Sequence, residues 1–353
     1  MARLRRLPAE WEPQGAVQLT WPHPDGDWED NLRPAQECFA SIGAAISPDQ
    51  LLLSVVHDPE HEAHVRSLLR QHGANPEHCL FATAPSEDSW ARDHAALSVH
   101  ENGHWRLLDF EFNGWGGRYP AEHDNALTRE LARQGVFGDT AITRPGLTLE
   151  GGAIETDGEG CLLLRTPTLL DPRRNPGLDR QDLETALAEW LGAEHCMWLE
   201  SGNLDGDDTD GHIDTLARFA PGGIILFQAC NDPGDSHYVS LRAMAAELGS
   251  FTRAEGQAWQ LMPLPLPAPV HDSAGRRMPA GYANFLVTNH RVLVPAYDDP
   301  ADPIAVERIA QAFPDREVLS LDCRALVRQG GSLHCVTMQY PPGVVVPPGS
   351  GQA

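Results

Sequence analysis

Short apolar runs alternate with amphipathic segments along this chain. Residues 51–57 form a predominantly apolar run, as in a buried strand, and residues 32–46 have the spacing of a helix with one apolar face. Residues 59–71 are predicted to form another helix, with Asp58 as N-cap and Gly73 at its end. One helix among two or three short strands recurs about five times, at roughly 60–70 residues each. This rhythm predicts a mixed α/β fold.

Three segments place ionisable side chains in apolar or glycine-rich surroundings. Residues 90–93 are expected to lie in a loop after a strand at 79–83, and residues 147–156 are expected to form a strand. Residues 212–219 alternate between polar and apolar positions and also predict a strand. On such a strand His212 and Asp214 would share one face, because side chains alternate with a period of two. An imidazole and a carboxylate would then project side by side.

Composition narrows the class of protein. The 353 residues are 41% hydrophobic, enough for one large domain or two ordinary ones, and we expect a single domain over residues 1–353. The formal net charge of −24 argues against binding to nucleic acid or to an anionic membrane surface. That charge would attract a cationic substrate, although solubility alone also accounts for it.

The cysteines and the N-terminus bear on the compartment. Seven cysteines are scattered along the chain without a CxxC pair, which predicts neither a disulfide framework nor a zinc ribbon. The basic N-terminal residues lack an apolar segment behind them, and no run reaches the roughly 18 apolar residues of a membrane helix. A reducing cytoplasm is therefore expected, with the oligomeric state left open.

Cys335 is the strongest candidate for chemistry. It follows the pair Gly330-Gly331 and precedes a strand-like run, so the backbone can approach a ligand closely there. A thiol reacts as the thiolate and needs a cationic or dipolar neighbour. Upstream, His212 offers an imidazole, and Asp93 and Glu150 offer carboxylates. Together these are the parts of a nucleophilic site for a cationic substrate.

Each upstream group also has a simpler interpretation. Arg92 and Asp93 could form a surface ion pair, Glu150 could begin a turn, and the segment 112–116 could be a packed aromatic turn. A metal site is a further alternative, because His212, Asp214, His334 and Cys335 provide four potential ligands.

Taken together, several motifs resemble the agmatine deiminase and Porphyromonas-type peptidylarginine deiminase family, within the guanidino-modifying superfamily. The matching motifs are Pro8-Ala9-Glu10-Trp11-Glu12-Pro13, Trp21-Pro22-His23, Trp90-Ala91-Arg92-Asp93, Phe112-Asn113-Gly114-Trp115-Gly116, Glu150-Gly151-Gly152, Asp210-Gly211-His212-Ile213-Asp214 and Leu333-His334-Cys335-Val336-Thr337. They span nearly the whole chain in the family's order. The resemblance implies a five-bladed pseudo-symmetric α/β propeller, or pentein, of ββαβ-type units.

The resemblance also implies a role for each site residue. Cys335 would be the nucleophile and His212 the general acid and base, with Glu150 supporting His212. Asp93 and Asp214 would bind the guanidinium nitrogens. The remaining implied contacts to the substrate come from Trp90, Trp115 and Asp208. No metal or other cofactor is expected.

The choice of guanidine is less constrained. The implied reaction is hydrolysis of agmatine to N-carbamoylputrescine and ammonia. Asp208 stands where the family usually has glutamate, Gln329 where it has a third glycine, and Ser332 where it has asparagine. Another arginine derivative or peptidyl arginine is therefore an alternative substrate. An amidinotransferase, or a non-catalytic protein that binds polyamines or metal, remains a further possibility.

Overall fold

The structure, a computed structural model, describes residues 5–28, 31–254 and 256–347. The chain divides into two compact units, each built from separate stretches of sequence. Unit 1 comprises residues 1–11 and 152–334, and unit 2 comprises residues 12–151 and 335–353. The chain passes from one unit to the other three times: between Trp11 and Glu12, between Gly151 and Gly152, and between His334 and Cys335.

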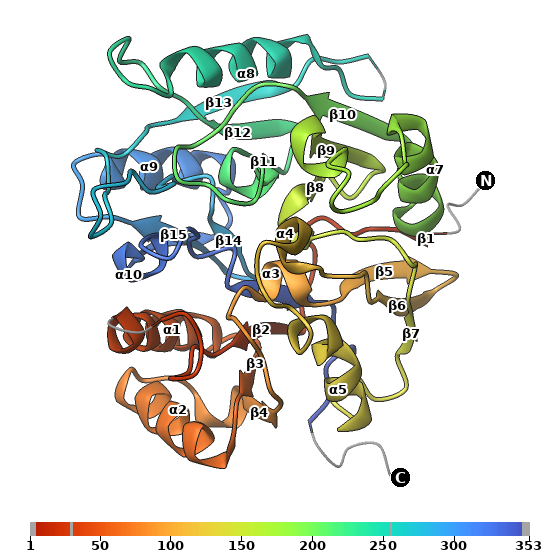
Figure 1. The fold of residues 1–353 in the computed structure, drawn as a ribbon, viewed down its shortest axis with the longest axis vertical. Coiled ribbons are helices and arrows are strands. Elements are labelled where there is room, and N and C mark those ends of the chain that lie inside the picture. Colours follow the sequence, from red (N-terminus) through yellow and green to blue (C-terminus); the bar gives the residue numbers. More distant parts are fainter. Residues whose placement is uncertain (1–4, 29–30, 255, 348–353) are drawn as a thin grey trace. The chain divides into compact units, whose positions relative to one another are not determined.

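Unit 1 contains three small sheets of identical strand order within its described residues (Figure 1). Their strands are β8 (Ile154–Thr156), β9 (Cys161–Arg165) and β10 (His195–Leu199); β11 (Ala217–Ala220), β12 (Ile224–Gln228) and β13 (Gln260–Leu264); and β14 (Leu286–Val287), β15 (Arg291–Ala296) and β16 (Glu317–Asp322). In each sheet the first two strands are antiparallel and the last two are parallel.

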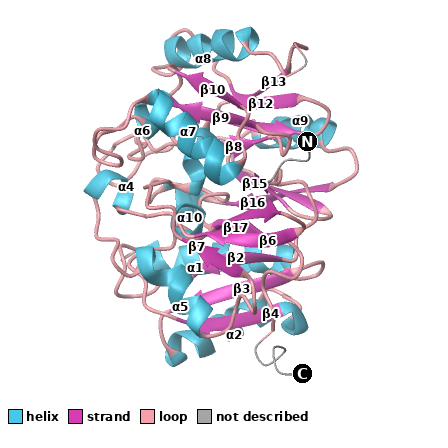
Figure 2. Ribbon diagram, turned by 90° about the vertical axis from the view of Figure 1, so that its right-hand side faces the viewer, coloured by secondary structure: helices cyan, strands magenta, loops and turns pink. Residues whose placement is uncertain are grey.

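In each of these sheets a helical crossover connects the two parallel strands, because parallel neighbours cannot be joined by a tight turn. We call each sheet with its crossover helix a ββαβ module. These crossovers contain α6 (Thr166–Leu169) with α7 (Arg180–Leu191), α8 (Tyr238–Ser250) and α9 (Asp302–Ala312). Strand β1 (Arg5–Arg6) and helix α10 (Arg324–Val327) complete unit 1. In Figure 2 the strands of these small sheets run side by side, and α8 packs against β10.

Unit 2 contains two further sheets in which an antiparallel pair is followed by parallel pairing. Its first sheet has the order β17-β2-β3-β4, with β17 (Thr337–Tyr340) antiparallel to β2 (Ala16–Thr20) and parallel pairing through β3 (Leu51–Val56) and β4 (Cys79–Thr83). The second contains β5 (Leu97–Glu101), β6 (His104–Leu108) and β7 (Ala141–Thr143), antiparallel and then parallel.

Five α-helices belong to unit 2 in its described residues. They are α1 (Leu32–Ile46), α2 (Pro59–Gln71), α3 (Ala91–His94), α4 (Gly114–Gly117) and α5 (Leu127–Arg133). Helices α1 and α2 pack on each other and on strands β2 to β4 (Figure 1). The carboxylate of Asp58 accepts a hydrogen bond from the N–H of His61, which confirms the predicted N-cap.

Three predicted elements near the candidate site were wrong. Residues 90–93 do not form a loop, since Ala91–His94 is a short helix closed by the bond from Ala95 N–H to Ala91 O. The strand expected at 147–156 is limited to Ile154–Thr156, after the glycine pair. The strand expected at 212–219 begins only at Ala217, because Thr215 bonds back to the His212 carbonyl and closes a 3-10 turn over Ile213–Thr215.

In the described part of the chain no helix combines the length and apolar character needed to cross a lipid bilayer.

Candidate active site

The eight predicted site residues are distributed over both units. Five of them, Trp90, Asp93, Trp115, Glu150 and Cys335, belong to unit 2, and three, Asp208, His212 and Asp214, belong to unit 1. Each group is described within its own unit.

In unit 2, Cys335 lies in the turn before β17 and its side chain is 7% exposed. Its carbonyl accepts a hydrogen bond from the N–H of Arg92 at 3.1 Å, which joins the cysteine motif to helix α3. The loop after Glu150 touches the same helix, because a Cβ added at Gly151 would lie 2.2 Å from the Arg92 carbonyl oxygen. Only glycine allows this approach. Glu150 is fully buried. Unit 2 therefore holds Cys335, Asp93 and Glu150 on adjoining segments.

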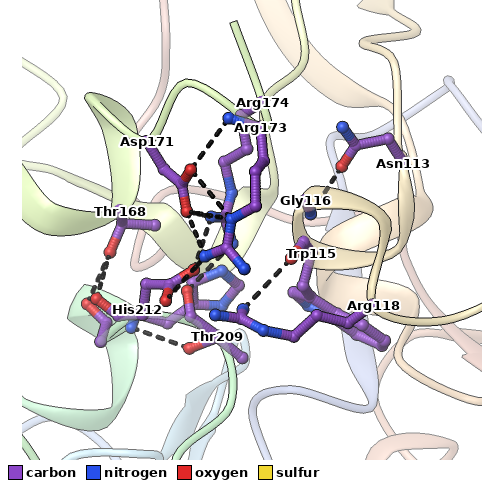
Figure 3. A network of polar contacts seen from close by, with 12 residues as sticks. Asn113, Trp115, Gly116, Arg118, Thr168, Asp171, Arg173, Arg174, Thr209 and His212 are labelled. Carbon is purple, nitrogen blue, oxygen red and sulfur yellow. Dashed lines mark hydrogen bonds and ion pairs between the residues drawn. The ribbon is translucent and has the colours of Figure 1, made fainter.

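Trp115 orients Asp93. The indole Nε1–H donates to Oδ2 of Asp93 at 3.0 Å, and both side chains are buried. Trp115 has φ 55° and ψ 51°, a left-handed conformation uncommon for a bulky residue. Asn113 supports this turn by accepting a hydrogen bond from Gly116 N–H at 2.8 Å (Figure 3). Trp115 thus acts on Asp93 as well as being a predicted substrate contact.

Trp90 is also held by a carboxylate. Its Nε1–H donates to Oδ2 of Asp88 at 2.9 Å, and its ring lies 5.7 Å from that of Trp28. Burial raises the pKa of Asp88 to about 7, against the hydrogen bonds from Ser89 and Trp90 that lower it. The indole therefore depends on a group that titrates near neutrality.

In unit 1, the acidic loop before His212 is ordered by its own hydrogen bonds. Asp207 accepts from the Thr209 hydroxyl at 2.6 Å and from Gly211 N–H at 2.6 Å. The Thr209 hydroxyl accepts in turn from His212 N–H at 3.0 Å (Figure 3). Burial raises the pKa of Asp207, although the Thr209 bond opposes it. His212 is 1% exposed at the end of this loop.

A buried cation binds the same loop. The fully buried Arg174 donates to Oδ2 of Asp210 at 2.8 Å and to the Thr209 carbonyl at 2.9 Å (Figure 3). Asp208 is half-buried, and its Oδ1 lies 3.7 Å from the Cβ position of Gly330. Asp208, a predicted substrate contact, is therefore next to the glycine pair that precedes Cys335, within unit 1.

Asp214 lies in a buried chain of charged residues. Its Oδ2 contacts Nδ1 of His334 at 2.7 Å, and Nε2 of His334 contacts Oε2 of Glu10 at 2.7 Å. Arg218 donates to Glu10 and to Glu155, each at 2.8 Å. An ionised carboxylate can only accept, so with Asp214 and Glu10 both ionised His334 donates from both ring nitrogens as the imidazolium.

This chain keeps Asp214 ionised. Burial alone would raise its pKa, but the hydrogen bond and charge of His334, with the charges of His212 and Arg218, outweigh burial and lower it. Both ring nitrogens of His334 contact carboxylates, which overturns the alternative of His334 as a metal ligand.

Sequence reasoning missed His334, Glu10 and Arg218 as supporting residues. One signal was present: Arg218 interrupts the apolar strand Ala217–Ala220, and an arginine at such a position indicates a buried ion pair.

Comparison with known proteins identifies the family of this chain. Residues 6–341 match the sequence profile of the family described as Porphyromonas-type peptidyl-arginine deiminase. The chain belongs to this family. The resemblance carried by the seven motifs is confirmed, as is the mixed α/β class of the fold.

Three similar proteins show how much of the chain is shared and at what sequence identity. A Marinomonas sp. (strain MWYL1) protein, provisionally named agmatine deiminase, is 33% identical over 95% of this chain and 94% of its own. A Porphyromonas gingivalis structure, provisionally named arginine deiminase, is 45% identical with TM-score 0.90, covering 97% of this chain and 100% of that chain. A cysteine-to-serine variant of C. jejuni agmatine deiminase with substrate bound is 32% identical with TM-score 0.87, covering 95% and 96%.

Proposed function

We propose that this protein hydrolyses the guanidinium group of agmatine, giving N-carbamoylputrescine and ammonia. The observation that carries the proposal is the similarity, over 95% of the chain, to the C. jejuni agmatine deiminase that holds its substrate. The net charge of −24 suits a substrate that is cationic at both ends. The proposed reaction involves no nucleic acid, no membrane and no cofactor.

In the proposed mechanism the Cys335 thiolate attacks the guanidinium carbon and forms a C–S bond. The C–N bond of the tetrahedral adduct then breaks, and His212 protonates the leaving ammonia. Water, deprotonated by His212, attacks the resulting thiouronium carbon, and the C–S bond breaks to release the ureido product and regenerate the thiolate. One imidazole thus serves as acid and then as base.

Two carboxylates make the poor electrophile reactive. We assign Asp93 and Asp214 to the guanidinium nitrogens, because paired N–H···O contacts orient a planar cation and keep it protonated. Both side chains are already orientated within their own units, Asp93 by Trp115 and Asp214 by His334. In the same proposal Glu150 supports His212 and Trp90 lies along the substrate's carbon chain.

We extend the proposal to the architecture and compartment. The five ββαβ modules would close into a five-bladed α/β propeller, with residues 1–353 acting as one catalytic domain. The seven cysteines, all free thiols, suit a reducing compartment such as the cytoplasm. Assembly into a homo-oligomer would be compatible with this chemistry.

The deciding experiment measures ureido product and free ammonia from the purified protein with agmatine, arginine, methylarginines and an arginyl peptide. Cys335→Ala should bind agmatine and release no ammonia. Cys196→Ala is the matched control, since burial raises the pKa of that thiol to about 12 and keeps it protonated. Turnover by Cys335→Ala would refute the mechanism, and amidine transfer to an added amine without ammonia would indicate an amidinotransferase.

Asp208 tests the choice of substrate. We assign its carboxylate to the distal ammonium of agmatine, so Asp208→Asn should lower kcat/KM for agmatine by about 10-fold or more, the loss expected for a hydrogen bond between charged groups. It should leave n-butylguanidine, which lacks that ammonium, unchanged. An equal loss with both compounds would contradict the assignment.

Arginine is the second candidate substrate, favoured by the name of the Porphyromonas gingivalis relative at 45% identity. A higher kcat/KM for arginine than for agmatine would replace the proposed substrate while retaining the proposed chemistry.

A further inference from the structure

The carboxyl ends of three neighbouring parallel strands in unit 2 bring polar groups together. His23 follows β2, His57 follows β3 directly, and Ser86 follows β4. The strands are adjacent in the order β2-β3-β4, and the N–H of Trp21 continues the pairing to the Val55 carbonyl at 2.9 Å. Ligand sites in parallel sheets form at this edge. The motif containing His23 has no role in the proposed deiminase chemistry.

Three potential ligands converge at this edge. One ring nitrogen of His23, one of His57 and a carboxylate oxygen of Asp25 all lie within 4.8 Å of one another. The rings of His23 and His57 are stacked with centroids 4.2 Å apart. His23 is 3% exposed, whereas Asp25 is exposed, so the cluster reaches from the interior to solvent.

The hydrogen bonds of His23 determine which nitrogen is available. Its Nε2 lies 3.0 Å from the Ser86 carbonyl, which can only accept, so Nε2 carries the proton. Nδ1 then bears a lone pair, and it is buried with no hydrogen-bond partner in the described part of the chain. A ring N–H bound to a backbone carbonyl, with the other nitrogen free, is the usual arrangement of a histidine that binds metal.

His57 also has a ring nitrogen available for coordination. Its Nδ1 is also buried and lacks a partner among the described residues. Its backbone N–H donates to Nδ1 of His61 at 3.1 Å, so His61 fixes the position of His57 rather than offering that nitrogen itself.

We propose that His23, His57 and Asp25 bind a divalent transition-metal ion, of which Zn²⁺ is the representative. Two imidazole nitrogens and one carboxylate oxygen suit this class of ion, and the exposed side leaves a coordination position for water. Tetrahedral bonds of about 2.0–2.2 Å place ligand atoms about 3.3–3.6 Å apart, so the three side chains would move closer together by small rotations when the ion binds. The ion would connect the segments that follow β2 and β3.

The proposal is independent of the deiminase reaction and is tested by binding. The full chain, produced without a histidine tag and treated with chelator, is titrated with ZnCl₂ by calorimetry and with CoCl₂ by visible absorption. We expect one Zn²⁺ per chain, a cobalt d–d spectrum with nitrogen and oxygen ligation, and a higher melting temperature with Zn²⁺.

Two variants locate the site. His57→Ala and Asp25→Asn should each weaken Zn²⁺ binding by about 100-fold or more and abolish the cobalt spectrum. His104→Ala, which removes an exposed histidine of β6, should bind like the wild type. Circular dichroism of each metal-free variant confirms that it is folded. The proposal is overturned if the wild type binds neither ion, or if folded His57→Ala and Asp25→Asn bind both as the wild type does.

Discussion

At the scale of single residues, Asp214 depends on its neighbours for its charge. A carboxylate with no exposed surface is unfavourable unless it is paired and hydrogen-bonded. His334 supplies the pairing, and Glu10 on the far side holds the imidazole as a cation. The residue next to the proposed nucleophile in sequence thus acts on a proposed substrate-binding carboxylate.

His334→Gln should therefore affect both activity and pH dependence. Glutamine keeps a polar group there but no charge, so the pKa of Asp214 should rise. We expect kcat/KM to fall by about 10- to 100-fold, from loss of a charged hydrogen bond, and the acidic limb of its pH profile to move to higher pH. His195→Gln, at an exposed position of β10, is the control. An unmoved acidic limb would contradict a role through Asp214.

The ionisation of Asp214 should also make the stability of the protein depend on pH. The folded-state pKa of Asp214 is lower than its usual value of 3.8, so its stabilising contribution is complete above that value. It is lost as the pH falls through the folded-state pKa.

At the scale of elements, local sequence signals predicted some segments well and others poorly. Leu32–Ile46 and Pro59–Gln71 match their predictions because apolar spacing and capping act within the segment itself. The strand expected at 212–219 failed because Thr209 and Thr215 bind His212 from either side, which alternation of polarity does not record. The short helix of Ala91–His94 is too brief for a periodic pattern.

The segment between β4 and α3 contains a second pH-sensitive element. Asp88 binds the Trp90 indole, and its N–H in turn donates to Asp124, whose pKa is raised by burial and then by the charge of Asp88. With a folded-state pKa of about 7 against 3.8 in the unfolded chain, Asp88 binds more protons when folded between these values. Stability should fall as the pH rises through this window.

Asp88→Asn should remove this dependence. The amide oxygen can still accept from Trp90, without ionisation. In urea unfolding, the variant should gain stability over the wild type as the pH rises from about 4 to about 7, on the order of 1 kcal/mol per pH unit. Tryptophan emission of the wild type should change with a midpoint near pH 7, and that of the variant should not. Asp139→Asn, at an exposed position, is the control and should behave like the wild type. An emission change that persists in Asp88→Asn would assign the titration to a different group.

At the scale of the whole molecule, net charge bears on substrate capture. A charge of −24 creates a field that attracts cations over distances beyond contact. Salt shortens that range, from a Debye length of about 30 Å at 0.01 M to about 3 Å at 1 M.

Raising NaCl over this range should lower kcat/KM for agmatine and leave kcat nearly constant, because capture is screened while the bound complex is not. The slope should be steeper for agmatine, with two cationic groups, than for n-butylguanidine with one. Steady-state kinetics at matched pH measure both. Equal slopes, or a fall confined to kcat, would exclude long-range attraction.

By itself the sequence determined the class of fold, the family and the candidate chemical groups, because apolar periodicity and short motifs are local properties of the chain. Only the tertiary structure revealed that His334 and Glu10 keep Asp214 charged, that Trp115 orients Asp93, and that His23 and His57 meet at one sheet edge. Hydrogen bonds between residues far apart in sequence, such as that between Glu10 and His334, leave no periodic trace. Their partners follow from how strands are paired and side chains are packed, and those depend on the folded chain.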